Sequence, residues 1–356
     1  MSVAYRAIDW NQQKRRYDLG VVAAVVLALG AFTGVSLRLS PHFTAEILLL
    51  RGTAVAAFLL LHLVLCIGPL CRLQPRFLPL LYNRRHLGVT LFLLGGIHAT
   101  LATIQFHALG DVSPLESIFS AYSDDYRILT DGRVNLAHFP FEPFGAIALV
   151  ILFLMAATSH DFWLRSLGPS FWKTLHFGAY AAYGLILAHV ALGILQSERS
   201  TVYPSLIAIG FTLVAGLHLA AARQERRIDT RCGTPVRDDF ATVCKLEEVP
   251  EGRGRVVVTN GRRIALFRHG NRIFATSNVC RHQGGPLGEG RMVDGCITCP
   301  WHGWNYQPQD GCSPPPFQER IETYETRIVG DTVLVRRDPN PPGTCVAGSP
   351  VPNPFL

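Results

Sequence analysis

The chain has 356 residues, of which 49% are hydrophobic and 17% charged, and its formal net charge is +7. The apolar residues are concentrated before residue 223, which predicts a membrane protein with a soluble C-terminal part. The positive charge does not indicate nucleic-acid binding, because the Arg and Lys residues lie mainly between apolar runs, where membrane orientation accounts for them. The nine cysteines show no disulfide framework.

Six apolar runs follow a polar, basic N-terminal segment at 1–18. Each is close to the length of about 20 residues that crosses a bilayer, and the fourth is the shortest. Helices are expected, since lipid offers no water to unpaired backbone groups. The sequence thus predicts an all-α six-helix membrane bundle over 19–222, with spans at 19–37, 45–70, 87–108, 143–158, 175–195 and 203–222.

The distribution of charge predicts how these spans are oriented. Fourteen Lys and Arg residues lie in 1–18, 71–86, 159–174 and 223–231, against four in the opposite loops. By the positive-inside rule, both termini face the cytoplasm. The acidic loop at 109–142 is then expected outside.

The composition changes at residue 223. A basic linker is expected at 223–236, followed by a small all-β domain at 237–338. Short β-like runs at 255–259, 263–268 and 332–336, separated by Gly and Asn turns, indicate its strands. The Pro-rich tail at 339–356 is expected to be disordered.

The β domain contains two short metal-ligand motifs, Cys280-Arg-His282 and Cys299-Pro-Trp-His302. A structural Cys2His2 zinc site is one interpretation. However, each motif holds one Cys and one His, as required when two thiolates bind one iron and two imidazoles bind the other. The surrounding sequences, CRHQGGPL and CPWHGWNY, strongly resemble Rieske proteins. The resemblance implies a [2Fe-2S] cluster with those four residues as ligands.

The residues around the motifs predict the tuning of the cluster. Hydrogen bonds to a cluster raise its reduction potential. Trp304 offers no hydroxyl, whereas Tyr306 does, and neither motif contains the extra cysteine of high-potential Rieske proteins. The loops therefore resemble those of Rieske ferredoxins and oxygenases. An oxygenase is disfavoured, since its iron needs two further histidines and no histidine follows His302.

Histidines within the apolar runs indicate a second type of cofactor, because polar groups in a membrane are costly and usually functional. His86 and His98 lie on the third run, and His176 and His189 on the fifth. The spacing sets His86 level with His176 and His98 level with His189, about 18–20 Å apart in depth. Two bis-imidazole haems would fit, provided that the fifth run bends near Gly178 or Gly184 or the haems have different partners. His62 and His218 are expected to form interhelical hydrogen bonds.

Motifs in the first 222 residues resemble a known family. They include Gly68-Pro69-Leu70-Cys71, Asn83-Arg84-Arg85-His86, Ala157-Thr158-Ser159 and Trp172 with Leu175-His176. The region looks like the ferric-reductase-type transmembrane domain, most closely the haem-binding subunit of bacterial periplasmic methionine sulfoxide reductase systems. This resemblance implies b-type haem on His98, His176 and His189, in a bacterial-type inner membrane. His86 is a further tentative candidate, with an interfacial histidine as the alternative.

The sequence therefore predicts transmembrane electron transfer between a cytoplasmic-side [2Fe-2S] cluster and one or two haems b. The proposed direction is from a cytoplasmic donor to an extracytoplasmic acceptor, because the β domain occupies the place of the flavin and nicotinamide module in related reductases. Alternatives are quinol-linked transfer toward a cytoplasmic acceptor, and a redox subunit of a larger complex. Expected partners are membrane lipid and donor and acceptor proteins. Whether the chain is an enzyme or an electron-transfer component stays open.

Overall fold

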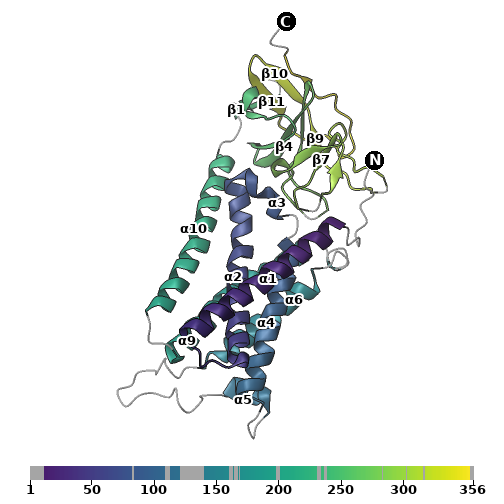
Figure 1. The fold of residues 1–356 in the computed structure, drawn as a ribbon. Coiled ribbons are helices and arrows are strands. Elements are labelled where there is room, and N and C mark those ends of the chain that lie inside the picture. Colours follow the sequence, from purple (N-terminus) through teal and green to yellow (C-terminus); the bar gives the residue numbers. More distant parts are fainter. Residues whose placement is uncertain are drawn as a thin grey trace. The chain divides into compact units, whose positions relative to one another are not determined.

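The computed structural model describes residues 12–81, 84–108, 113–120, 140–159, 163, 167, 169–197, 201–230, 234–235, 239–282, 284–301, 303–315 and 317–352. The chain divides into two compact units, one of residues 5–66 and 83–216 and the other of residues 67–82 and 217–356. The first is helical, and the second joins two helix ends to a β domain (Figure 1). Most of the acidic loop predicted at 109–142 lies outside the described residues.

The N-terminal region is made of apolar helices. The long ones are α1 (Gln12–Leu39), α2 (Ala45–Leu73), α4 (Arg84–Phe106), α6 (Glu142–Ala157), α9 (Gly178–Ser197) and α10 (Val202–Thr230). Shorter helical segments are η1 (Pro75–Phe77), α3 (Leu78–Leu81), α5 (Pro114–Ser120) and α8 (Pro169–His176). Helices α2 and α10 begin in the helical unit and end in the other one.

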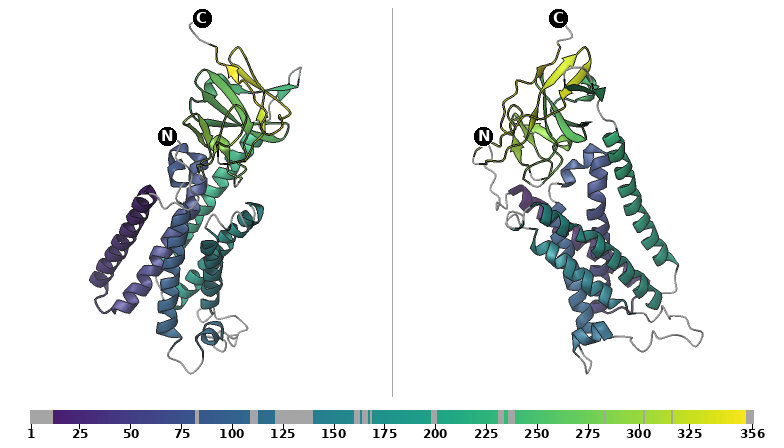
Figure 2. Two further views of the ribbon diagram at one scale, coloured as in Figure 1. Left: turned by 90° about the vertical axis from the view of Figure 1, so that its right-hand side faces the viewer. Right: turned by 180° about the vertical axis from the view of Figure 1, so that it is seen from behind.

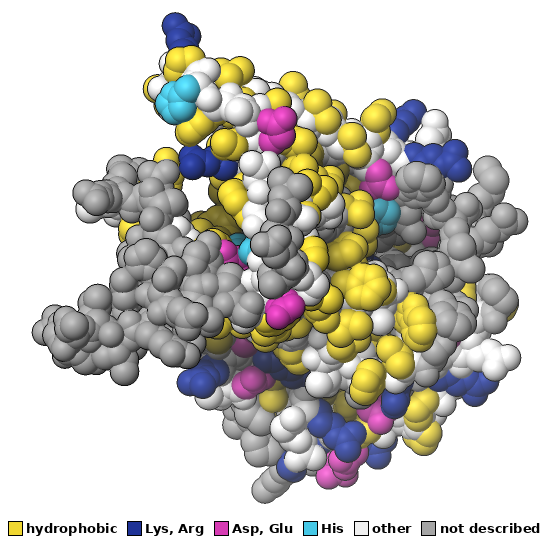
Figure 3. Space-filling view, turned by 90° about the horizontal axis from the view of Figure 1, so that it is seen from below, with side chains coloured by type: hydrophobic (Ala, Val, Ile, Leu, Met, Phe, Trp, Pro, Cys, Tyr) yellow, Lys and Arg dark blue, Asp and Glu magenta, His cyan; other side chains and the backbone are white. Residues whose placement is uncertain are grey.

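Five helices in the described residues are long and apolar enough to cross a membrane: Arg15–Leu39, Ala45–Leu73, Arg84–Phe106, Thr174–Gly193 and Tyr203–Thr230. The fourth predicted span forms α6, whose 16 residues fall short of the usual length. Large apolar side chains such as Leu27 and Leu206 are 73% and 58% exposed. Figure 3, which views the molecule of Figure 1 from below, shows hydrophobic side chains over much of the described surface. Such a surface suits lipid rather than water.

Helix α6 lies beside both α4 and α9 (Figure 2). The ring centres of Phe92 on α4 and Phe153 on α6 are 5.7 Å apart. The fifth predicted span is interrupted at Phe177, between the last residue of α8, His176, and the first of α9, Gly178. A bend near Gly178 is one of the conditions under which the histidine spacing would fit two haems.

The β domain consists of three antiparallel sheets. One has the order β1 (Thr234–Pro235), β2 (Phe240–Lys245), β11 (Thr332–Arg336), β10 (Thr326–Val329). The second has the order β12 (Ser349–Pro350), β5 (Arg272–Ser277), β4 (Arg262–His269), β3 (Gly254–Thr259), with β9 (Thr323–Tyr324) on β5. The third joins β6 (Arg291–Val293), β7 (Cys296–Thr298) and β8 (Asn305–Tyr306).

The core of this domain lies between the first two sheets. Ile264, Leu266, Ile273, Val333 and Val335 are all 0% exposed and belong to one hydrophobic cluster. Strands β3 and β4 are joined at Asn260-Gly261, both with positive φ. Positive φ at both positions is typical of a two-residue hairpin turn, which Asn-Gly adopts readily. The predicted Gly and Asn turns are therefore present.

Two expected boundaries differ from the structure. The basic linker expected from residue 223 is helical as far as Thr230, because α10 continues through it. The expectation of a disordered tail after residue 338 is wrong for its described part. Ser349 and Pro350 pair with β5 as β12, and Val351 is 6% exposed. Pro350 is tolerated because it lies on the edge strand of the sheet.

Candidate functional site

The two Cys–His motifs form matching turns. The amide of Gly284 donates to the carbonyl oxygen of Cys280 (2.7 Å), and that of Gly303 to the carbonyl oxygen of Cys299 (3.0 Å). The two glycines have φ of 71° and 69°. Non-glycine residues rarely adopt this conformation. Each cysteine amide also donates across its own turn, to Gly285 and Trp304 respectively.

The two turns also meet each other. A Cβ added to Gly285 in the first turn would lie 2.8 Å from Sγ of Cys299 in the second. Cys280 and Cys299 are 1% and 2% exposed and form no disulfide. Nδ1 of His282 is also buried. Two buried thiols with a buried imidazole nitrogen are a donor set that suits an iron–sulfur cluster. His302 lies outside the described residues.

Tyr306, on β8, contacts the first cysteine. Its hydroxyl oxygen lies 3.4 Å from Sγ of Cys280 and accepts a hydrogen bond from the amide of Arg281 at 2.9 Å. Burial, and then the charge of Cys280, raise the pKa of Tyr306 well above its ordinary value. The hydroxyl therefore keeps its proton and can donate a hydrogen bond to the sulfur. Thus Tyr306 is positioned to tune a cluster held by Cys280.

Trp304 has a role that the sequence did not indicate. Its ring stacks on His282, with centres 4.1 Å apart and planes 8° apart. Its indole nitrogen donates to Oγ of Ser313 at 3.0 Å, and Phe317 packs on it at 4.3 Å. Trp304 therefore fixes the orientation of the His282 imidazole. The sequence of the motif indicates only that Trp304 lacks a hydroxyl. It cannot predict the stacking, because stacking depends on the fold of the turn.

In the helical unit, the structure brings His98 and His189 together. Their ring centres are 6.3 Å apart and their planes are inclined at 76°. Nδ1 of His98 donates to the carbonyl oxygen of Leu50 (3.2 Å), and Nδ1 of His189 to that of Phe141 (2.9 Å). Since a carbonyl oxygen only accepts, both rings carry their proton on Nδ1 and the lone pair on Nε2. Metal-ligating histidines typically hold the second nitrogen in this way.

The separation of this pair can be compared with that of two imidazoles on one metal ion. A metal–imidazole bond is about 2 Å long and the ring centre lies roughly 1 Å beyond the nitrogen, so two such rings are centred about 6 Å apart. The observed 6.3 Å agrees. Gly145 on α6 makes room for His189, since a Cβ there would lie 2.8 Å from its ring. Sequence reasoning missed Gly145, because a lone glycine in a helix carries no distinctive signal.

The structure does not pair the other two candidates, since His86 and His176, both described, make no ring contact with each other. Nδ1 of His86 donates a hydrogen bond to Oδ1 of Asp18 on α1 at 2.6 Å. His176 stacks on Trp172, with centres 3.7 Å apart, and its Nδ1 donates to the carbonyl oxygen of Trp172.

His62 differs from the His98 pair, because both of its nitrogens are engaged. Nδ1 donates to the carbonyl oxygen of Phe58 (2.8 Å), and Nε2 accepts from the hydroxyl of Tyr183 (3.1 Å). The predicted interhelical hydrogen bond of His62 is therefore confirmed. That of His218 stays a prediction.

Comparison with known proteins assigns both regions. Residues 239–325 match the family model of the Rieske [2Fe-2S] domain. Residues 52–187 match the ferric reductase like transmembrane component. The fold and the two buried thiolate turns thus define an iron–sulfur redox protein with a membrane domain.

Individual relatives cover the β domain. The biphenyl dioxygenase ferredoxin subunit of Pseudomonas sp. (strain KKS102) is 34% identical over 27% of this chain and 90% of its own length. The cytochrome b6-f complex iron-sulfur subunit of Chlorobaculum thiosulfatiphilum is 29% identical over 28% of this chain and 54% of its own length. A solved ferredoxin of carbazole 1,9a-dioxygenase from Nocardioides aromaticivorans IC177 has 22% identity and a TM-score of 0.27, covering 28% of this chain and 100% of its own.

The chain belongs to the Rieske [2Fe-2S] proteins, and it joins a Rieske domain to a ferric reductase-like transmembrane component. Its role is redox electron transfer, in a membrane setting. The fit of Cys280, Cys299 and His282 to a [2Fe-2S] cluster agrees with this family.

Proposed function

We propose that the protein carries electrons across a membrane, between the cluster of its Rieske domain and one b-type haem held by His98 and His189. The observation that carries this proposal is the arrangement of the two imidazoles. Their ring centres are 6.3 Å apart, and both Nδ1 atoms are hydrogen-bonded to carbonyl oxygens. When bound, the haem iron would supply a one-electron centre inside the membrane domain. The cluster would be held by Cys280, His282, Cys299 and His302.

The proposed electron path begins on the cytoplasmic side. The fourteen-to-four bias in Lys and Arg supports placing the Rieske domain there. A soluble reductase or flavoprotein would deliver electrons near His282, and an extracytoplasmic acceptor would remove them. The relatives named as dioxygenase ferredoxins support exchange with soluble redox proteins, since a ferredoxin shuttles electrons between partners.

A second candidate function is quinol-linked transfer in the opposite direction, which the likeness to a cytochrome b6-f complex subunit favours. In that case membrane quinol would be the donor and a cytoplasmic protein the acceptor. The hydrogen bond from Tyr306 to Cys280 also favours it, because such bonds raise the potential of a cluster. A redox subunit of a larger complex would use the same residues.

The composition and topology of the purified full-length protein test this proposal. Iron, sulfide and haem analysis should give one [2Fe-2S] cluster and one haem per chain, with a Rieske-type EPR signal and the absorbance of low-spin haem b. Zinc in place of iron, or a protein without haem, would overturn it. A reporter fused after Leu356 should be active only in the cytoplasm, and activity outside would reverse the proposed direction.

A further inference from the structure

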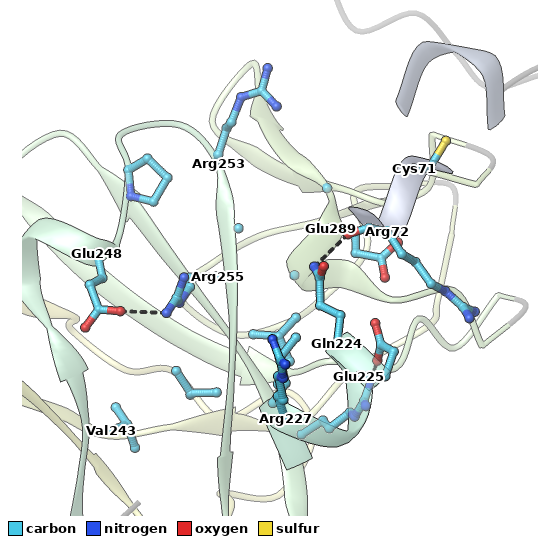
Figure 4. Close-up of a pocket in the computed structure, with 18 residues that line it drawn as sticks. Cys71, Arg72, Gln224, Glu225, Arg227, Val243, Glu248, Arg253, Arg255 and Glu289 are labelled. Carbon is cyan, nitrogen blue, oxygen red and sulfur yellow. Dashed lines mark hydrogen bonds and ion pairs between the residues drawn. The ribbon is translucent and has the colours of Figure 1, made fainter. Parts of the chain in front are cut away.

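A charged cavity lies in the unit that contains the Rieske domain. Its volume is about 590 Å³, within the usual range for ligand sites. The walls come from the end of α2, the end of α10, strand β3 and the turn η4 (Leu287–Glu289) (Figure 4). Nε2 of Gln224 on α10 donates to the carbonyl oxygen of Arg72 on α2 at 2.9 Å, which joins two of these walls.

The cavity carries more positive than negative charge. Five arginines and three glutamates line it: Arg72, Arg227, Arg253, Arg255, Arg263, Glu225, Glu248 and Glu289. Two arginines are already paired, Arg255 with Glu248 (2.6 Å) and Arg263 with Glu225. Among the residues with described positions, Arg72, Arg227 and Arg253 form no salt bridge. An anionic ligand would therefore meet cations from three separate segments.

Glu289 is the third glutamate of the cavity. It forms no ion pair with any residue in the described part of the chain. Burial raises its pKa to about 7, with Arg72 and Arg263 opposing and Glu225 reinforcing the effect. These three charged side chains face it from α2, β4 and α10. Near neutral pH, Glu289 is protonated in part of the population, which increases the excess of positive charge.

The approach to the cavity along the last part of α10 is apolar. Leu219 is 58% exposed. It lies about two turns before Arg227, about 12 Å away along the helix axis and roughly 80° around it. An exposed apolar side chain beside a cationic cavity matches a ligand with an acyl chain and an anionic head.

We propose that this cavity binds the phosphate of an anionic phospholipid, with an acyl chain against the exposed side chain of Leu219 on α10. Basic pockets at the ends of membrane helices bind such headgroups. Arg72, Arg227 and Arg253 would contact the phosphate. The bound lipid would join the ends of α2 and α10 to the Rieske domain, and it takes no part in the electron transfer proposed above.

Lipid titration of the full-length protein in neutral detergent tests the proposal. The probes are short-chain phosphatidylglycerol, phosphatidylcholine with the same chains, and glycerol 3-phosphate, followed by calorimetry. Phosphatidylglycerol should bind at least tenfold more tightly than the other two. Equal binding of the two lipids would overturn the proposal. Glycerol 3-phosphate that binds as tightly as phosphatidylglycerol would assign the cavity to soluble phosphates and overturn the lipid assignment.

Variants separate the cavity from general surface charge. Arg72→Gln with Arg253→Gln should weaken phosphatidylglycerol binding at least tenfold, while the matched variant Arg327→Gln, on exposed β10, should leave it within twofold. A retained Rieske EPR signal shows that each variant is folded, and Arg253→Gln alone should weaken binding several-fold if the double variant does not fold. An equal loss in Arg327→Gln would contradict the proposal.

The pH dependence gives an independent test. Phosphatidylglycerol keeps its single charge between pH 6 and pH 8, whereas Glu289 ionises in this interval. Binding should therefore be several-fold tighter at pH 6, and Glu289→Gln should bind equally well at both values. A pH dependence that persists unchanged in Glu289→Gln would remove this residue from the site and count against the proposal.

Discussion

The imidazole of His282 lies face to face with the indole of Trp304, with ring centres 4.1 Å apart and planes 8° apart. Trp304 is itself held by the hydroxyl of Ser313 and by Phe317. The stack explains how a turn rich in glycine holds the side chain of His282 in one orientation. It also gives Trp304 a positioning role in place of the hydroxyl that the residue lacks.

Loss of this stack should weaken the binding of the cluster to the protein. Trp304 is 3% exposed, and replacing it by alanine should destabilise the domain by about 3–5 kcal/mol. Trp304→Ala should lower the iron content per chain and broaden the EPR signal, whereas Trp304→Phe, which keeps a stacking ring, should retain both. Normal iron content and line shape in Trp304→Ala would show that the stack is dispensable.

Removing the hydroxyl of Tyr306 should lower the potential of the cluster. Tyr306→Phe keeps the buried ring but loses the contact with Sγ of Cys280. One hydrogen bond to a redox centre corresponds to roughly 20–60 mV for a one-electron couple. An EPR-monitored redox titration measures the change. Tyr324→Phe is the matched control, since Tyr324 is also buried (2% exposed) and lies in the hydrophobic core. An unchanged potential in Tyr306→Phe would argue against this tuning.

Haem binding should depend on one pair of histidines. His98→Ala and His189→Ala should each abolish the haem absorbance while leaving the Rieske EPR signal. Gly145→Ala should reduce haem content, because its Cβ would displace the ring of His189. His62→Ala is the control, since His62 is buried but its Nε2 is already bonded to Tyr183.

His86 and His176 test the number of haems. His86→Ala should retain the haem, because His86 is paired with Asp18 and makes no ring contact with His176, its described counterpart. A second haem per chain, lost in both His86→Ala and His176→Ala, would contradict the single-haem proposal.

Stability should decrease as the pH rises through neutrality, owing to Glu289. Its pKa is raised from the ordinary 4.5 to about 7. Between these values the unfolded chain has released this proton and the folded protein still holds it, so stability falls with rising pH. The effect is at most about 3 kcal/mol, from roughly 1.4 kcal/mol per unit of pKa. Thermal unfolding from pH 5 to pH 8 should show a flatter profile for Glu289→Gln, and an identical profile would exclude this residue.

The features that the sequence could predict are those set by local spacing. Cys280-x-His282 and the second motif identify the Rieske domain, because two Cys–His motifs of this spacing indicate the chemistry without knowledge of the fold. Apolar length locates the helices, and the depth of each histidine within its span aligns His98 with His189. The same reasoning cannot tell which aligned pair meets, because that depends on helix rotation and packing. Accordingly, His98 contacts His189, whereas His86 turns to Asp18.

Features that depend on distant contacts were not predictable. Arg263 on β4 donates hydrogen bonds to Glu225 and Asp229 on α10, which are 38 and 34 residues away in the sequence. Both acidic residues belong to the segment that was expected to be a linker. Ser349 and Pro350 form an edge strand although their local sequence is rich in proline. In both cases the partner, and not the segment itself, determines the structure.

Rapid-mixing spectroscopy of the purified full-length protein tests most directly whether one chain carries electrons between a Rieske cluster and a membrane haem. With a soluble reductase and a nicotinamide donor, the cluster should be reduced first and the haem second. In His98→Ala, which should lack haem, the electrons should remain on the cluster. Haem that is reduced before the cluster, or by quinol alone with the cluster following, would contradict the proposed path.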